Sequence, residues 1–424
     1  MNRPLSRYVD YMYSYPHKTA YRPFPAPLSL LSYLKQVEGR KASLYFHIPF
    51  CSHKCGYCNL FSLQTNRTES IAAYLDTLYR QAQQLSPLTA GLTFDGFAIG
   101  GGTPLLLTVA QLEQLMVTAS LFGVHPSRTF TSVETSPEYA DRPRLDVLKR
   151  SGVARVSIGI QSFLDEELKA LKRRPRQNTI YRALEEIRQM DFPCFNIDLI
   201  YGIKGQTVES FLYSLKEALR FRPSELFIYP LYVRRGTGIT EREPDDVCFR
   251  MYRAACDLLQ AEGFLQTSMR RFVRHRPTGA EVSCGDEVML SCGSGGRSYL
   301  GDLHYATRYT VCQQCIAREI DDYVATTDFT VARNGFLLSA GEQRQRFIIK
   351  NLLYYMGLDK AEYLRRFGES VDRIPLFRQL AERQWTEETP ERIRLTPEGL
   401  GYSDYIGQLF ITPEIRQLME TYTY

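Results

Sequence analysis

Three cysteines, Cys51, Cys55 and Cys58, lie within eight residues in the segment YFHIPFCSHKCGYCNLF, residues 45–61. A CxxxCxxC loop can give three thiolates to a [4Fe–4S] cluster and leave one iron with an open position for a substrate. A structural zinc site needs four ligands, and no CxxC partner or His pair lies nearby, although His53 lies inside the loop. The pattern favours an iron–sulfur cluster, with zinc and unligated core thiols as the alternatives.

The chain around this loop alternates between short apolar runs and amphipathic stretches. Helical spacing occurs in residues 69–85, 108–120, 179–190 and 207–220. Strands that alternate with helices predict parallel βαβ units with right-handed crossovers, in a doubly wound sheet or a barrel of fewer than eight units. The expected strands span residues 44–48, 96–100, 129–134, 155–161, 195–201 and 225–232.

Polar residues lie in or directly after these expected strands. In parallel α/β proteins the loops that follow the strand ends converge on one face, and that face carries the active site. We therefore expect one site that is built from several distant segments. In chain order its candidates are the three cysteines, the segment GGGTP (residues 100–104), Glu134, Gln161, Asp198 and Tyr229.

Composition narrows the class of protein. The chain has 424 residues, enough for two domains, and its 44% hydrophobic content is ordinary for a globular protein. It has no run of roughly 18 apolar residues and no apolar signal-peptide core, so we expect a cytoplasmic protein with reduced cysteines. The net charge of +5 is small, and the absence of a Lys/Arg block argues against a nucleic-acid partner.

Five ordered motifs carry a resemblance to a known family: YFHIPFC, the cysteine triplet that begins at its last residue, GGGTP, RVSIGIQSF and NIDLIYGIKGQT. Together they resemble the radical S-adenosylmethionine (SAM) enzymes of the oxygen-independent coproporphyrinogen III oxidase branch. The likeness runs from about Ala42 to the LTPEGL segment of the tail. It implies an α/β fold with a partial (β/α)6 barrel at residues 42–245, after an N-terminal arm at 1–41 and before a mainly helical C-terminal domain at 246–424.

The resemblance also implies cofactors and site residues. A [4Fe–4S] cluster on Cys51, Cys55 and Cys58 would bind SAM and cleave it to a 5′-deoxyadenosyl radical that oxidises an organic substrate. The catalytic positions implied are Tyr45 and Glu134, which also contact SAM beside Gly101 and Gly102. Contacts to a second SAM would fall on Tyr57, Gly102, Thr103, Gln161, Arg173 and Asp198. The implied partners are a small, anionic substrate of the tetrapyrrole kind and an electron donor such as flavodoxin or ferredoxin.

Departures from the family leave the reaction open. Leu60 stands where the oxidases carry a further cysteine, Arg297 stands where they place an apolar residue, and the HNxxYW signature of the heme-binding relatives is absent. The resemblance therefore supports the fold and the cofactor chemistry of this chain more strongly than its substrate. The alternatives to an oxidase are a radical SAM methyltransferase and a heme chaperone or carrier that retains the cluster.

Several other residues allow two interpretations each. Cys284, Cys292, Cys312 and Cys315 can hold an auxiliary cluster or zinc, or form a reduced pair. The basic stretch SMRRFVRHRP can grip an anionic substrate or form a solvated face; its charged residues are Arg270, Arg271, Arg274, His275 and Arg276. We expect His47 to hold the cysteine loop by a hydrogen bond, and the remaining thiols, Cys194, Cys248 and Cys256, to be small core residues.

Overall fold

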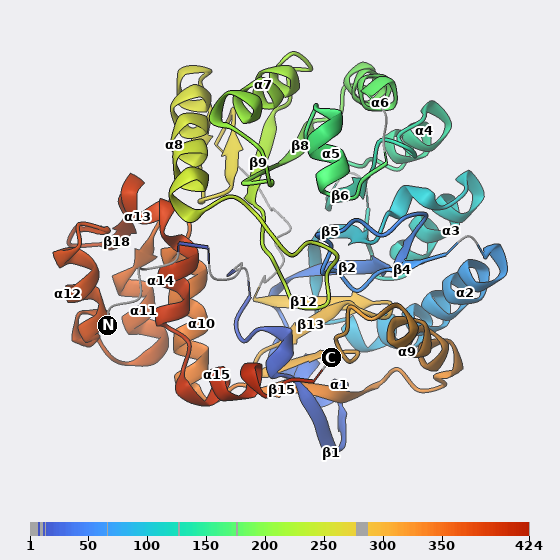
Figure 1. Ribbon diagram of the computed structural model, residues 1–424. Coiled ribbons are helices and arrows are strands. Elements are labelled where there is room, and N and C mark those ends of the chain that lie inside the picture. Colours follow the sequence, from blue (N-terminus) through green and yellow to red (C-terminus); the bar gives the residue numbers. More distant parts are fainter. Residues whose placement is uncertain are drawn as a thin grey trace.

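The computed structural model describes residues 7–8, 12, 14–65, 67–125, 128–174, 177–276 and 287–423. Its main sheet has a parallel part with helices along the outer side (Figure 1). All the strands expected from the sequence are present and follow chain order across the sheet, which confirms the α/β prediction. In spatial order the parallel strands are β12 (Val288–Cys292), β2 (Lys41–Ile48), β5 (Thr93–Gly101), β6 (Phe130–Thr135), β7 (Arg155–Gln161), β8 (Cys194–Tyr201) and β9 (Glu225–Pro230).

Helices connect the neighbouring parallel strands. Thr108 and Thr207 close capping boxes that begin two of these helices, and each helix buries one apolar face against the sheet. Strand β2 is almost wholly buried because its two faces are both covered. The connecting helices are α2 (Thr68–Leu85), α3 (Val109–Ser120), α4 (Arg142–Arg150), α5 (Asp165–Ala170), α6 (Gln177–Met190) and α7 (Val208–Leu219).

Antiparallel strands extend both edges of the parallel part. On one edge lie β11 (Arg271–Val273) and β10 (Leu265–Gln266), and on the other β13 (Arg297–Leu300), β14 (Leu303–Ala306), β15 (Val331–Leu337) and β1 (Arg22–Ser29). Within the described residues no pairing joins β1 to β10, so the sheet is open. The sequence pattern did not predict the short strands β12–β15. Gly293 and Gly295, in the turn between β12 and β13, and Gly301, in the turn between β13 and β14, have positive φ.

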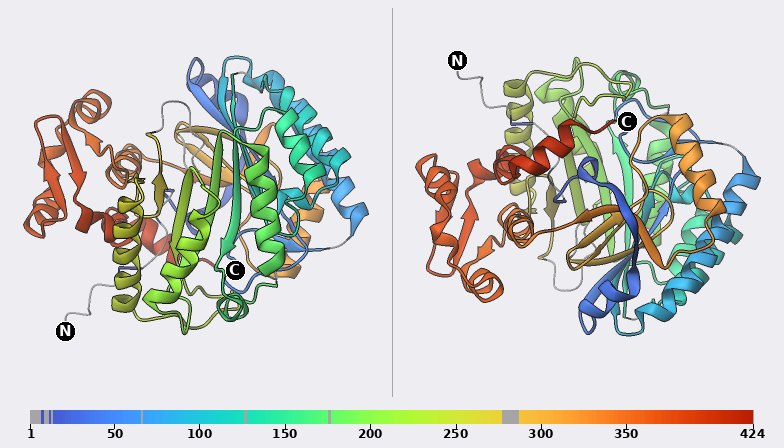
Figure 2. Two further views of the ribbon diagram at one scale, coloured as in Figure 1. Left: turned by 90° about the horizontal axis from the view of Figure 1, so that it is seen from above. Right: turned by 90° about the horizontal axis from the view of Figure 1, so that it is seen from below.

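The chain after β15 packs around a second hydrophobic core that includes Phe347, Trp385 and Ile406. Figure 2 shows this part to one side of the sheet, next to α8 (Asp245–Ala261). This part is mainly helical, whereas the earlier part of the expected C-terminal domain, residues 246–424, adds strands β10–β15 to the main sheet. The boundaries between domains remain predictions. The elements after β15 are α10 (Ala340–Leu352), β16 (Leu358–Asp359), α11 (Lys360–Phe367), α12 (Pro375–Glu382), β17 (Thr386–Glu388), β18 (Arg392–Leu395), α13 (Pro397–Gly401), α14 (Ser403–Leu409) and α15 (Pro413–Glu420).

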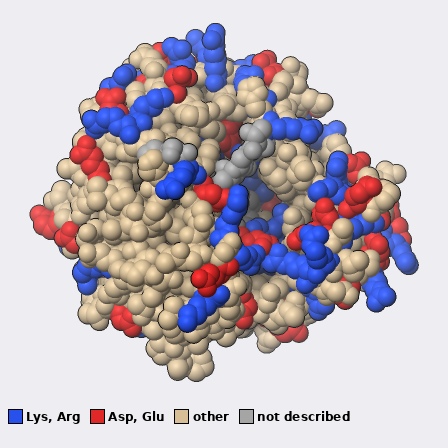
Figure 3. Space-filling view, turned by 180° about the vertical axis from the view of Figure 1, so that it is seen from behind, with Lys and Arg blue, Asp and Glu red and all other residues tan. Residues whose placement is uncertain are grey.

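Shorter elements complete the fold: α1 (Leu30–Gln36), β3 (Phe50–Cys51), β4 (Leu63–Gln64) and α9 (Gln313–Ala325). Helix α9 packs beside α2 and β4 (Figure 1). On the face seen in Figure 3 the surface is hollowed near its centre, and basic side chains around the hollow are interspersed with acidic ones. None of the described helices is both long and apolar enough to cross a membrane.

Candidate functional site

A cavity of about 450 Å³ opens at the carboxyl ends of the parallel strands. Its volume falls within the range of about 300–1,000 Å³ that is usual for small-molecule sites. Its wall includes every residue that the resemblance implied as part of the site. These are Tyr45, Cys51, Cys55, Tyr57, Cys58, Gly101, Gly102, Thr103, Glu134, Gln161, Arg173 and Asp198. The strand ends thus converge as the βαβ pattern predicted.

Cys51 ends the short strand β3, and Cys55 and Cys58 lie in the loop that joins β3 to its partner strand β4. The Thr103 hydroxyl lies 3.6 Å from the Cys51 sulfur and can donate to it, and Cys58 Sγ lies 3.8 Å from Ser62 Oγ. Burial raises the pKa of the Cys51 thiol to about 12 and also raises that of Cys55. These thiols therefore keep their protons until a metal replaces them.

His47 on β2 holds the cysteine loop by a hydrogen bond, as expected. The ring Nε2 lies 2.9 Å from the carbonyl oxygen of Phe61, which can only accept, so Nε2 carries the proton. Nδ1 then accepts from the Tyr45 hydroxyl at 3.2 Å. Burial lowers the pKa of His47 to about 4, which keeps the ring neutral. Tyr45 is thereby oriented at the edge of the cavity.

Two glycines at the end of β5, Gly101 and Gly102, let the backbone pass close to the cavity floor. A Cβ on Gly102 would lie 2.4 Å from the Phe50 carbonyl oxygen, and Gly101 has a φ of +116° beside the His47 ring. The Gly101 N–H points to Glu134 Oε2 at 3.4 Å. Glu134 itself is open to the cavity, although the protein around it raises its pKa by desolvation. Backbone and carboxylate together form a polar cradle without bulky side chains.

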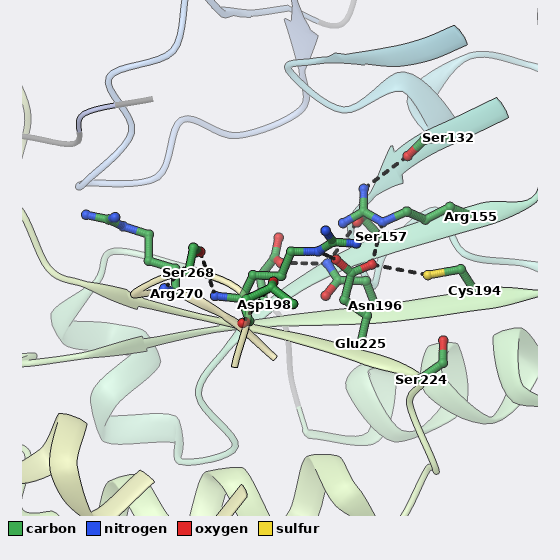
Figure 4. A network of polar contacts seen from close by, with 12 residues as sticks. Ser132, Arg155, Ser157, Cys194, Asn196, Asp198, Ser224, Glu225, Ser268 and Arg270 are labelled. Carbon is green, nitrogen blue, oxygen red and sulfur yellow. Dashed lines mark hydrogen bonds and ion pairs between the residues drawn. The ribbon is translucent and has the colours of Figure 1, made fainter. Parts of the chain in front are cut away.

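Asp198 lies further along the same wall and accepts a hydrogen bond from the Asn196 amide at 2.8 Å (Figure 4). Burial raises the pKa of Asp198 to about 7, in spite of the Asn196 bond and the nearby Arg155, which both act to lower it. The Asn196 amide also donates to Ser157 Oγ at 2.8 Å, while its own Oδ1 is buried without a hydrogen-bond partner. A ligand donor at this point could bond to Asp198, which lines the cavity.

Arg173 crosses from the loop after α5 to Tyr57 in the cysteine loop. Its guanidinium donates to the Tyr57 hydroxyl and to the Gly159 carbonyl, both at 2.9 Å, and its buried Nε has no partner. Gln161 ends β7 at an irregularity in the β7–β8 pairing and has a φ of +74°. A non-glycine residue in the left-handed region is strained, which is frequent at functional sites.

Sequence reasoning missed Ser157 and Asn196, which line or support the cavity. Both lie two residues before a residue that faces the site, Gly159 and Asp198, so the period of two along a strand could have found them. It also missed Lys18, from the N-terminal segment. Arg297, which stands where the oxidases place an apolar residue, lines the cavity and donates to Ser14 Oγ at 2.6 Å. Leu60 lines it too.

The basic stretch at residues 268–277 needs a correction, because neither expected interpretation fits Arg270. This side chain is buried in an ion pair with Asp404 of α14, and it also contacts Tyr232. Arg271 pairs with Glu225 of β9, and Arg274 donates to backbone carbonyls. These arginines are structural because their charges already have carboxylate or carbonyl partners. His275 and Arg276 are exposed, and none of the five lines the cavity.

The other cysteines also have defined places. Cys248 is buried as expected, whereas the half-buried Cys194 donates to Glu225 at 3.1 Å and Cys256 lies on α8. Cys292 is buried in β12, and Cys312 and Cys315 lie at the start of α9. Cys284 falls outside the described residues. Among the residues that are described, no three His, Cys, Asp or Glu side chains surround one position the size of a single ion, and this includes the three thiols of the cavity, so a zinc site gains no support at either group of cysteines.

Comparison with known proteins relates this chain to a family and to two characterised relatives. Residues 45–218 match the model of the radical SAM superfamily. The chain carries a radical SAM domain. It is 27% identical over 389 residues to the heme chaperone HemW of Bacillus subtilis, covering 87% of this chain and all of HemW. It is equally 27% identical over 389 residues to the oxygen-independent coproporphyrinogen III oxidase of Escherichia coli, covering 84% and 82%.

The fold of the whole chain follows one solved radical SAM structure closely. The coproporphyrinogen III oxidase HemN of Escherichia coli superposes with a TM-score of 0.82 at 24% identity, over 94% of this chain and 96% of that one. The radical SAM superfamily uses a [4Fe–4S] cluster and SAM. The residues present fit both groups, because three thiols face one cavity and the glycine cradle leaves room where side chains would clash.

Proposed function

We propose that the chain is a radical SAM enzyme that oxidises an anionic organic substrate of the tetrapyrrole class. The supporting observation is that three thiols and a glycine cradle line one cavity, whose wall carries more cationic than acidic side chains. An excess of positive charge in a recessed site favours a substrate that bears carboxylates. The acidic wall residues are Glu134, Glu138 and Asp198, and the cationic ones are Lys18, Lys54, Arg173, Arg174, Arg234 and Arg297.

Each implied residue has a role in this proposal. Cys51, Cys55 and Cys58 would hold the cluster, and Glu134 would accept a hydrogen bond from the amino group of SAM. When bound, the cluster supplies the electron that cleaves SAM to methionine and a 5′-deoxyadenosyl radical, which takes a hydrogen atom from the substrate. Tyr45, held by His47, closes the wall beside Gly101 and Gly102. A second SAM would lie against Tyr57, Thr103, Gln161, Arg173 and Asp198.

The first test is anaerobic reconstitution with iron and sulfide. We expect a coloured protein that releases 5′-deoxyadenosine when SAM and dithionite are added. Cys55→Ala should lose both the cluster and the product, whereas Cys256→Ala, which removes a half-buried thiol on α8, should lose neither. A wild-type protein that holds zinc in place of iron would refute the cluster assignment.

The reaction itself is tested by mass spectrometry with coproporphyrinogen III in the same mixture. Loss of carboxyl groups with formation of vinyl groups supports the oxidase. S-adenosylhomocysteine with a methylated product would instead indicate methyl transfer, in which the second SAM donates its carbon. The electron donor, of the flavodoxin or ferredoxin kind, is replaced by dithionite here so that it does not limit the result.

A second candidate is a heme carrier, because the Bacillus subtilis relative that matches along its full length is a heme chaperone. Two histidines line the cavity, and both are engaged: His47 by Phe61 and Tyr45, and His53 through Nε2 with the Lys172 carbonyl at 2.7 Å. An iron ligand from His47 would have to break such a bond, whereas His53 Nδ1 is buried without a hydrogen-bond partner and could bind iron with the Nε2 bond intact. Stoichiometric heme uptake without SAM cleavage would favour the carrier.

A further inference from the structure

The CQQC segment at the start of α9 is built differently from the cysteines of the cavity. Cys312 is the N-cap of this helix and is exposed, and its sulfur accepts the backbone N–H of Cys315 at 3.4 Å. Cys315 is half-buried one turn later. Both thiols are free. The first is therefore accessible to solvent and the second stands next to it, which is the arrangement that a nucleophilic and a resolving thiol need.

The electrostatics of the pair separate the two thiols further. Hydrogen bonds from the Cys315 thiol and backbone lower the pKa of Cys312, and the Arg318 charge acts in the same direction. The pKa of Cys315 is raised by its hydrogen bond to Cys312. The exposed thiol is consequently the better nucleophile at neutral pH, since the thiolate is the reactive form.

We propose that Cys312 and Cys315 form a thiol–disulfide exchange site whose substrate class is an accessible disulfide. The Cys312 thiolate attacks one sulfur of that disulfide, the S–S bond breaks, and one thiolate leaves. Cys315 then loses its proton to water and attacks the Cys312 sulfur, which releases the second thiolate. Two protein thiols are thus oxidised to one disulfide while the substrate disulfide is reduced to two thiols.

This pair is also connected to the cavity. Gln313, between the two cysteines, accepts the N–H of Gln64 at 2.8 Å and donates to the Ser62 carbonyl at 2.9 Å. Ser62 and Gln64 lie four and six residues after Cys58. Because Gln313 lies between Cys312 and Cys315, a disulfide between these two would enclose it, and we expect the Gln313 contacts to respond to oxidation.

The test uses the holoprotein, kept without oxygen, in mixtures of reduced glutathione and glutathione disulfide. Peptide mapping should show a reversible Cys312–Cys315 disulfide in the wild type. Cys315→Ser should accumulate a mixed disulfide with glutathione at Cys312. In Cys312→Ser the remaining thiol, Cys315, should react with glutathione disulfide at least about tenfold more slowly than the wild-type pair, because the activated thiol is gone. Cys256→Ser should behave as the wild type.

Three results would overturn the proposal. They are independent modification of both cysteines with no bond between them, equal reactivity of Cys312 and Cys315, or one zinc ion per chain that is lost in Cys312→Ser. The link to the cavity has its own readout in hydrogen exchange of the Gln64 amide. We expect its protection to differ between the dithiol and disulfide forms, and equal protection would refute the link.

Discussion

Two groups of cysteines in this molecule have opposite environments. Cys51 and Cys55 face a cavity, where burial raises their pKa values, whereas Cys312 is exposed at a helix N-cap, where hydrogen bonds lower its pKa. The first group suits a metal cluster, because iron can displace the protons that these thiols otherwise keep at neutral pH. The second suits exchange with other sulfur compounds. The spacing of cysteines alone does not reveal this difference; burial and hydrogen bonding decide it.

The largest expected effect is on alkylation of the cluster-free protein at neutral pH. Cys312 should react with iodoacetamide at least about a hundredfold faster than Cys51, because desolvation raises the pKa of the half-buried Cys51 and leaves little of it as thiolate. Mass spectrometry of peptides over time measures both rates. If Cys51 reacts as fast as Cys312, the contrast between the two groups fails.

The second prediction concerns the backbone that fixes the cavity group. Gly102→Ala should lower the free energy of unfolding by roughly 2–3 kcal/mol and reduce cluster incorporation, because its Cβ would meet the Phe50 carbonyl beside Cys51. Gly341→Ala is the matched control. Its Cβ would have no neighbour closer than 3.7 Å, so we expect it to be neutral or to stabilise α10 by about 0.5–1 kcal/mol. Urea denaturation compares the two, and equal stabilities would contradict the steric argument.

The third prediction concerns the contact between the two groups. Gln313→Ala removes both hydrogen bonds to the segment after Cys58, which should cost about 1 kcal/mol and speed hydrogen exchange at the Gln64 amide. Gln314→Ala changes the next, exposed residue and should leave that amide protected. Similar exchange in both variants would show that the two groups are independent.

The fourth prediction tests whether burial at the cavity is the cause of the raised pKa values. Asp198 has a pKa of about 7 in the folded chain against 3.8 for an unperturbed aspartate side chain. Between these values the folded state holds a proton that the unfolded state has lost, so the contribution of this group to stability falls as pH rises from about 4 to 7. Asp198→Asn should flatten that part of the profile in thermal unfolding. An unchanged slope would mean that the cavity does not desolvate this carboxyl.

Much of the site follows from local sequence. The period of two in the strands, the helical spacing between them and the polar residues at the strand ends together predicted which segments converge, and His47 was expected to hold the loop. Strands β12–β15 were missed because short runs beside a glycine-rich turn carry no periodic signal of their own. Arg270 was misjudged because its partner, Asp404, lies 134 residues away.

The sequence by itself determined the parallel α/β units, the cysteine triplet and the face on which the site forms, because these depend on periodicity and spacing within short segments. Only the tertiary structure decided which charges are neutralised, which thiols are buried, and how α9 meets the cysteine loop. Those properties depend on desolvation and on contacts between distant segments, and the folded chain sets both.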